Sequence, residues 1–300
     1  MTDPVIDVTA LVKRFGGFTA VDGLDLRVAA GEVHGFLGPN GAGKSTTIRV
    51  LLGFYRATAG RVRVLGLDPG RQAAAVTVRI SYVPGEVVLW PHLTGQEVLD
   101  AVAGLRGHRD EVAEQRLAEA FALDRRRLVH TYSKGNRQKV ALVAAFAART
   151  DLLVLDEPTS GLDPLMEEVF QQCVRDAAAD GRTVLLSSHI LAEVEDVCDT
   201  VTIIKDGRLV ESGRLSDMRH LAASTVTARL TGDRHASVVA RLEQAGLTVS
   251  TDAGVVRLSV PRDRVPAVLG VLADADAGDI TCTPAKLEDL FLRHYQVAAR

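Results

Sequence analysis

Residues 38–45 read Gly-Pro-Asn-Gly-Ala-Gly-Lys-Ser and fit the pattern G-x-x-x-x-G-K-S/T. The apolar stretch Glu32–Leu37 before this segment predicts a strand, and Thr46–Leu52 after it predicts a helix. Glycines in this context let successive backbone N–H groups turn toward phosphate oxygens, and the helix start adds its positive dipole end. We expect Lys44 to reach the β- and γ-phosphates of a nucleotide and Ser45 to bind Mg²⁺. A chance glycine-rich turn is the alternative, and the strand–loop–helix context disfavours it.

The 300-residue chain is long enough for one large domain or two ordinary ones. Strand-like and helix-like stretches alternate over residues 1–217, which indicates an α/β core with a parallel sheet. Residues 86–150 are mostly helical in pattern and predict an inserted helical subdomain. Residues 218–300 show the order β-α-β-β-α-β of a small ferredoxin-like module, followed by a helix at Leu287–Tyr295.

Composition argues against several classes of protein. The formal net charge is −3, so there is no basic field to hold a polyanion, and we expect no nucleic-acid partner. The three cysteines are far apart in sequence, which argues against a disulfide framework or a zinc site and favours a reducing compartment. The N-terminus does not resemble a signal peptide, and the longest apolar run, Val140–Ala148, is too short to cross a bilayer. Any action at a membrane would therefore need a partner.

Two carboxylates follow the apolar strand Leu152–Leu155, at the end where open α/β sheets bind ligands. We expect Asp156 to hold Mg²⁺ through water and Glu157 to act as the general base that polarises the attacking water. His189 follows another predicted strand, Thr183–Ser187, and is expected to contact the γ-phosphate and orient that water. An acidic pair after a strand is often only solvated, and a lone histidine is often structural. The phosphate-binding pattern favours the catalytic interpretation of all three.

The polar segment Thr131–Val140, TYSKGNRQKV, leads into an apolar helix-like run. One interpretation is a capped, solvated helix start. The other is an anion site, in which the Ser133 hydroxyl and the Gly135 N–H at a helix N-terminus meet a phosphate. The segment by itself does not decide between them.

Together these motifs resemble the nucleotide-binding subunit of ATP-binding cassette (ABC) transporters over about the first 215 residues, in the expected order. The resemblance implies a P-loop NTPase core with an antiparallel N-terminal β layer, the inserted helical subdomain and the C-terminal α/β module. It implies ATP and Mg²⁺ as cofactors, Lys44, Glu157 and His189 as catalytic residues, and Ser160–Asp163 as the D-loop. The residues it assigns to ATP binding are Phe15, which would stack on adenine, with Gly38, Pro39, Asn40, Gly41, Ala42, Gly43, Lys44, Ser45, Thr46, Ser133, Gly135, Asn136 and Asp163.

In this family two subunits face each other head to tail, and the signature motif of one caps the ATP held by the other. Ser133–Asn136 stands where that motif is usually Leu-Ser-Gly-Gly-Gln. The spelling Ser-Lys-Gly resembles subunits that serve ABC-2 type exporters, including antibiotic-resistance exporters. The implied partners are a second ATPase subunit, expected to be a copy of this chain, and a separate transmembrane permease. The chain would be cytoplasmic and peripheral on the inner face of the membrane, held there through the permease without inserting itself.

Three alternatives remain beside an exporter ATPase. A soluble ABC ATPase acting on ribosomes or DNA usually has two cassettes or long coiled-coil arms, and this chain has one cassette and no heptads. An importer ATPase is disfavoured only by resemblance. A regulatory subunit that senses ATP with little turnover is suggested by Gly85, and Glu157 and His189 argue against it.

Gly85 is the main departure from the family, which normally has glutamine there as part of the Q-loop. Our hypothesis is that Glu86 takes over part of that role as an oxygen ligand for Mg²⁺, and the alternative is that it faces solvent. The following segment, Val87–Thr94, is expected to form part of a groove for the permease, with core packing of Trp90 as the alternative. The segment Lys286–Leu292 resembles one near the end of drug-exporter subunits, although an ordinary amphipathic helix would look the same.

Overall fold

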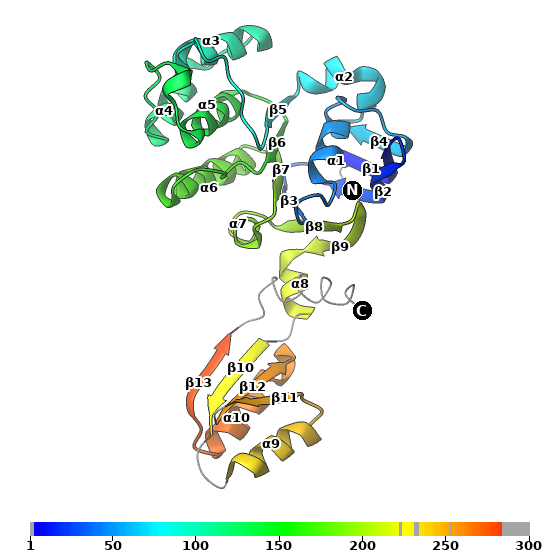
Figure 1. Ribbon diagram of the computed structural model, residues 1–300, viewed down its shortest axis with the longest axis vertical. Coiled ribbons are helices and arrows are strands. Elements are labelled where there is room, and N and C mark those ends of the chain that lie inside the picture. The colour runs from blue at the N-terminus through cyan, green and yellow to red at the C-terminus, as the bar shows by residue number, and fades with distance from the viewer. Residues whose placement is uncertain (1–2, 222–223, 231–233, 253, 284–300) are drawn as a thin grey trace. The chain divides into compact units, whose positions relative to one another are not determined.

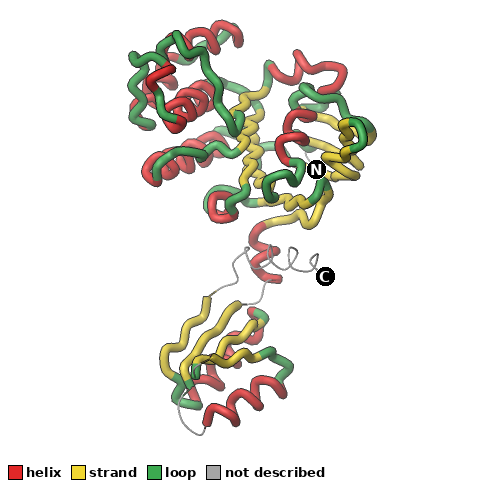
Figure 2. Tube along the Cα trace, in the orientation of Figure 1, coloured by secondary structure: helices red, strands yellow, loops and turns green. Residues whose placement is uncertain are grey.

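The computed structural model describes residues 3–221, 224–230, 234–252 and 254–283. The chain divides into two compact units, Met1–Gly213 and Arg214–Arg300. Helices and strands occur in both (Figure 2). The boundary suggested by the sequence, at residue 217, falls inside the helix α8 (Leu215–Leu221). Among the described residues, no helix is both long and apolar enough to cross a bilayer.

The first unit is built on a six-stranded sheet (Figure 1). Its strands are β3 (Val33–Leu37), β5 (Ile80–Val83), β6 (Leu152–Asp156), β7 (Thr183–Ser188), β8 (Thr200–Lys205) and β9 (Arg208–Arg214). The order is β5-β6-β7-β3-β8-β9, and the pairs from β5 through β8 are parallel. Every residue of β3, β6 and β7 is buried, as continuous apolar runs in a parallel sheet require. The predicted α/β core with a parallel sheet is thus confirmed, and its strands end at one common edge.

An antiparallel layer of three strands, in the order β2-β1-β4, completes the sheets of this unit. Its members are β1 (Ile6–Phe15), β2 (Phe18–Val28) and β4 (Ala59–Val64). This confirms the predicted N-terminal β layer, but both strands extend beyond the stretches that apolar alternation predicts, which are Val5–Leu11 and Leu24–Val28. Their pairing shifts register between Val8 and Leu11, between Leu11 and Val12, and between Lys13 and Arg14. These irregularities break the inside–outside alternation, so the alternating pattern covers only part of each strand.

Four helices flank these sheets: α1 (Lys44–Leu51), α2 (Pro69–Thr77), α6 (Pro164–Ala179) and α7 (Leu191–Glu195). The sequence did not predict α2. It buries only Pro69 and Val76, and a non-helical residue, Gln72, interrupts it, so it has no regular apolar stripe.

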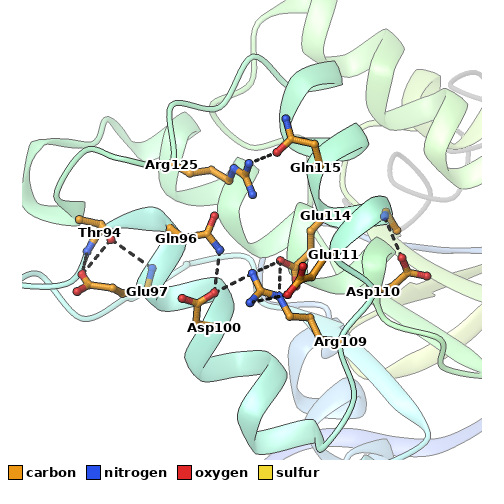
Figure 3. Close-up of polar contacts among 11 residues, drawn as sticks. Thr94, Gln96, Glu97, Asp100, Arg109, Asp110, Glu111, Glu114, Gln115 and Arg125 are labelled. Carbon is orange, nitrogen blue, oxygen red and sulfur yellow. Dashed lines mark hydrogen bonds and ion pairs between the residues drawn. The ribbon is translucent and has the colours of Figure 1, made fainter.

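The helical subdomain contains α3 (Gly95–Arg106), α4 (Glu111–Ala120), a single 3₁₀ turn (Val129–Thr131) and α5 (Lys134–Ala147). Figure 3 shows the polar contacts that join its first two helices. Arg109, between α3 and α4, lies 2.8 Å from Asp100 of α3 and 2.9 Å from the buried Glu114 of α4. Thr94 and Glu97 form a capping box at the start of α3. The Arg109 contacts hold α3 and α4 together, and both helices pack on α5.

The C-terminal end of α5 is anchored by two guanidinium groups. Arg106 donates to Ala144 O at 2.8 Å, and Arg182 donates to Phe146 O at 3.0 Å and to Thr150 O at 3.0 Å. Burial, with a smaller contribution from the charge of Arg106, lowers the pKa of Arg182 to about 10. The cations satisfy carbonyl groups that a helix end leaves unpaired. The opposite end of α5 begins at the signature segment, Ser133–Asn136.

The second unit has a four-stranded antiparallel sheet, in the order β11-β12-β10-β13, and a hydrophobic core of its own. After α8, its described elements are β10 (Ser224–Arg229), α9 (Arg234–Gln244), β11 (Val249–Asp252), β12 (Val255–Val260), a 3₁₀ turn (Arg262–Arg264), α10 (Val265–Asp274) and β13 (Gly278–Thr283). The order β-α-β-β-α-β is the predicted ferredoxin-like one. The helix expected at Leu287–Tyr295 and the segment Lys286–Leu292 lie outside the described residues.

Candidate nucleotide site

The phosphate loop, Gly38–Ser45, joins β3 to α1. Gly43 has φ of 104°, and a Cβ there would lie 2.7 Å from Ala20 O, so both its conformation and its surroundings require glycine. Gly43 is also the N-cap of α1, and no side chain caps this helix. By contrast, side chains cap α3, α4, α5 and α6. The first-turn N–H groups of α1 are therefore open to an anion.

Lys44 lies inside this loop and is only 5% exposed. Its Nζ donates to Gly38 O at 2.7 Å and to Pro39 O at 3.2 Å, and it lies 3.7 Å from Glu157 Oε1. Burial lowers the pKa of Lys44, and the charges of Glu157 and Asp156 oppose that shift. The ammonium group is thus held in a fixed position at the mouth of the loop.

Asp156 is the last residue of β6 and is 4% exposed. Its Oδ1 atom is buried and has no hydrogen-bond partner among the described residues. Burial raises the pKa of this carboxyl, while the nearby hydroxyls of Ser45 and Ser187 oppose the rise. A buried carboxylate oxygen with no partner is costly unless a cation or donor meets it. Asp156 and Ser45 therefore form a pair of hard oxygen groups beside Lys44.

Glu157 follows directly and turns the chain out of the sheet. Its φ is 49°, and its backbone N–H donates to Ser187 O at 2.9 Å. His189, just after β7, places Nδ1 3.2 Å from Glu157 Oε1. Lys44 and His189 thus both approach the same carboxylate oxygen, and the three residues predicted to be catalytic come together.

We expect Asp156→Asn to raise the melting temperature of the nucleotide-free protein by about 2–4 °C, which is about 1 kcal/mol for a domain of this size. The folded pKa of Asp156 lies above its ordinary value, so its ionisation lowers the free energy of unfolding as pH rises through that interval. A neutral amide avoids this penalty at neutral pH. Thermal melts without nucleotide or divalent metal measure it, with the exposed Glu168→Gln as control. A lower melting temperature for Asp156→Asn would mean that attraction to Lys44 outweighs the burial penalty.

The residues predicted to act across a dimer form a second group, where the start of α5 meets the turn before α6. The Ser133 Oγ accepts from Asn136 N at 3.2 Å, so Ser133 does cap α5. A Cβ on Gly135 would lie 2.3 Å from Gly161 O, so no larger residue fits there without movement. Lys134 Nζ lies 2.5 Å from Ser160 Oγ. The signature segment is therefore packed on the D-loop of its own chain. Asp163 caps α6 through Met166 N at 3.1 Å.

Phe15 is 41% exposed, as a residue that stacks on a base must be. Its ring packs edge-on against Tyr55, with centroids 5.2 Å apart, and the Lys13 ammonium lies 4.7 Å from its centroid. Gly85 lies against the end of β6, where a Cβ would be 3.3 Å from Asp156 O. The Glu86 side chain is exposed and lines a surface groove.

The sequence analysis did not predict a role for one buried polar residue near the site. Gln138 of α5 is 1% exposed, and its Nε2 donates to Pro158 O at 2.9 Å. This bond ties the signature helix to the residue that follows Glu157. Its one sequence signal is an amide in the first turns of an otherwise apolar helix, which by itself points to no partner.

Comparison with known proteins decides the family. The daunorubicin resistance ATP-binding protein DrrA3 of Streptomyces coeruleorubidus is 37% identical to this chain over 306 residues, which cover 97% of this chain and 96% of that protein. The chain belongs to the ABC transporter family. The sequence pattern of that family matches residues 21–160. The suggested resemblance is thus confirmed.

Further relatives agree with this ABC transporter assignment. The daunorubicin/doxorubicin resistance ATP-binding protein DrrA of Streptomyces peucetius is 38% identical over 266 residues, covering 86% of this chain and 81% of that protein. A solved structure described as the ATP-binding subunit of an ABC transporter matches with a TM-score of 0.67 and 32% identity, covering 72% of this chain and 92% of that one. The protein is therefore an ABC ATPase subunit that binds ATP, and such a subunit works with a separate transmembrane partner.

Proposed function

We propose that this ABC ATPase drives a separate ABC-2 type permease that exports a drug or another small hydrophobic compound. One observation carries the proposed role in ATP hydrolysis. Lys44 Nζ and His189 Nδ1 both approach Glu157 Oε1, at the edge where the strands of the parallel sheet end. The export role is supported by relatives whose names describe daunorubicin resistance and by the sequence Ser-Lys-Gly in the signature segment.

In this proposal the chain positions ATP and supplies charge around its γ-phosphate. The phosphate loop N–H groups and Lys44 hold the phosphates, with Thr46 in the first turn of α1. Glu157 takes the proton of the attacking water, and His189 orients that water from the other side. Phe15 stacks on the adenine.

Mg²⁺ fits the donors at this site. It prefers hard oxygen ligands and keeps several waters and phosphate oxygens, so it needs only one or two protein groups. The unpartnered Oδ1 of Asp156 and the hydroxyl of Ser45 provide such groups. Among the described residues no cluster of three or more acidic, histidine or cysteine side chains could hold a metal by itself. When bound, the ion would neutralise charge that develops on the phosphates.

Two copies of the chain are proposed to close over ATP, with Ser133, Gly135, Asn136 and Asp163 of one facing the phosphate loop of the other. Support comes from the exposed Ser133 at the N-terminus of the 14-residue helix α5, whose positive end suits a phosphate. The bond from Asn136 N to Ser133 Oγ leaves the hydroxyl hydrogen free to donate.

Sedimentation equilibrium tests this arrangement. Glu157→Gln should become a dimer on addition of MgATP, and Glu157→Gln with Ser133→Arg should stay monomeric, because a bulky side chain at the cap blocks close approach. Nucleotide binding is measured on both proteins. If both bind ATP and neither dimerises, self-assembly of this chain is wrong. Equal dimerisation of both would remove Ser133 from the interface.

The permease is proposed to dock in a groove of about 600 Å³ beside the signature helix. Val88 and Trp90, both from the predicted segment Val87–Thr94, are 82% and 51% exposed close to it. Large exposed apolar side chains of this kind suit a protein contact. Such docking would hold the chain on the cytoplasmic face of the membrane.

The role of Glu86 as a magnesium ligand stays a prediction. If it holds, Glu86→Ala should raise the Mg²⁺ concentration needed for half-maximal ATPase activity by about tenfold, by analogy with the loss of other metal-site groups. Asp110→Ala, a carboxylate change in the helical subdomain, is the control. An unchanged Mg²⁺ titration would leave Glu86 as a residue of the groove alone.

A further inference from the structure

Two separate loops carry the proposed base and the residue that faces it. Glu157 begins the loop after β6, and His189 begins the turn between β7 and α7. Their side chains are partly exposed, at 29% for Glu157 and 45% for His189. Neither side chain is therefore fixed by close packing, and their separation of 3.2 Å depends on how the two loops are held.

One carboxylate behind the site bonds to both loops. Glu193, the third residue of α7, accepts from Thr159 Oγ1 at 2.6 Å through Oε1 and from Ser188 Oγ at 2.5 Å through Oε2. Thr159 comes two residues after Glu157, and Ser188 comes directly before His189. Thr159 is 8% exposed and Ser188 is 1% exposed. Short hydroxyl–carboxylate bonds of this length are charge-assisted and about twice as strong as neutral ones.

Each loop has a further hydrogen bond that holds it in place next to Glu157 or His189. Ser188 Oγ also accepts from Ile190 N at 2.9 Å, which closes a tight turn around His189. On the other loop, Gln138 holds Pro158 O at 2.9 Å, between Glu157 and Thr159. The loop of Glu157 is thus fixed from α5 and from α7, and the turn of His189 is fixed from α7.

We propose that Glu193 is a positioning residue that sets the distance between Glu157 and His189 by bridging the hydroxyls of Thr159 and Ser188. This rests on the hydrolytic roles proposed for Glu157 and His189. Glu193 does not act on ATP itself. A simpler role exists for an acidic residue in the first turn of a helix, namely favourable interaction with the helix dipole. That role needs the negative charge and does not need the two hydroxyls, so the two roles are separable.

Steady-state ATPase kinetics of the full-length chain provide the test. Glu193→Ala should lower kcat by about 10- to 100-fold, the size of loss that a misplaced catalytic group causes. The KM for ATP should stay within about twofold, because the phosphate loop is untouched. Glu193→Gln should keep kcat within about threefold, since its amide can accept from one hydroxyl and donate to the other. Asp196→Ala is the matched control, because Asp196 joins the end of α7 to Gln171 of α6 without touching either loop.

A second set of variants keeps the proposal testable if Glu193→Ala folds poorly. Thr159→Val with Ser188→Ala removes both donors and should lower kcat as much as Glu193→Ala does. Adding Glu193→Ala to that pair should change kcat little, because groups that act as a unit are not additive.

Three results would overturn the proposal: wild-type kcat for Glu193→Ala, equal losses for Glu193→Gln and Glu193→Ala, or full additivity with the hydroxyl variants. Glu157→Gln, assayed alongside, separates the two claims. If Glu157→Gln loses turnover while Glu193→Ala does not, only the positioning role is wrong. If Glu157→Gln keeps normal turnover, the proposed roles at the site are wrong.

Discussion

Glu157→Gln should bind MgATP normally and lose at least about 10²- to 10³-fold in kcat, the contribution typical of a general base. The substitution keeps the size of the side chain and removes its capacity to take a proton. The amide can still contact Lys44 or His189, which lie 3.7 and 3.2 Å from the present carboxylate oxygen. The loss should therefore come from chemistry and not from a collapsed site.

Phosphate release gives kcat for this variant, and equilibrium binding of a fluorescent ATP analogue gives Kd. Glu168→Gln, an exposed change on α6, is the control and should match the wild type in both. An unchanged Kd with the expected fall in kcat assigns Glu157 to the chemical step. A variant that turns over normally would exclude it as the base, whatever its position beside the phosphate loop.

Lys44→Ala should weaken ATP binding by about 100-fold or more, since hydrogen bonds from a charged donor are worth about 1.5–3 kcal/mol and each 1.4 kcal/mol is tenfold. Two causes act together. The variant loses the ammonium that is proposed to hold the phosphates. It also loses the bonds from Nζ to Gly38 O and Pro39 O, which hold the loop in shape before ATP arrives.

Titration calorimetry with MgATP measures this loss directly. Lys139→Ala removes a half-buried lysine from α5, away from the phosphate loop, and should leave Kd unchanged. Wild-type affinity in Lys44→Ala would contradict the assignment of Gly38–Ser45 as the phosphate-binding element. A raised melting temperature is not expected, because removing Lys44 leaves the carboxylates of Asp156 and Glu157 without their nearest cation.

The parts of this molecule that were predictable from sequence are those fixed by neighbours in the chain. The buried strand β6 and the phosphate loop both depend on local residue order, since an apolar run makes a parallel strand and glycines permit the turn. The meeting of Glu157 and His189 also followed, because parallel strands that end at one edge bring their next residues together.

The parts that were not predictable depend on contacts between distant segments. The bridge from Glu193 joins residues that lie 34 and 5 positions away, and nothing in the local pattern of α7 marks it. Register shifts interrupt the inside–outside alternation of β1 and β2, so the sequence pattern shows only part of each strand. Glu86 shows the same limit, because the pattern indicates an oxygen ligand near Mg²⁺ but cannot say where an exposed side chain after a strand points.

The left-handed turn at Glu157 has a consequence for selection experiments. A residue with a Cβ at φ of 49° is held in a conformation that glycine and asparagine accept more readily. A library screened only for resistance to heat should therefore accumulate glycine and asparagine at position 157. If Glu157 is the base proposed above, each such gain in thermal stability would cost the ATPase activity. Directed evolution of a more thermostable subunit would therefore have to keep the codon for Glu157 fixed and vary other positions.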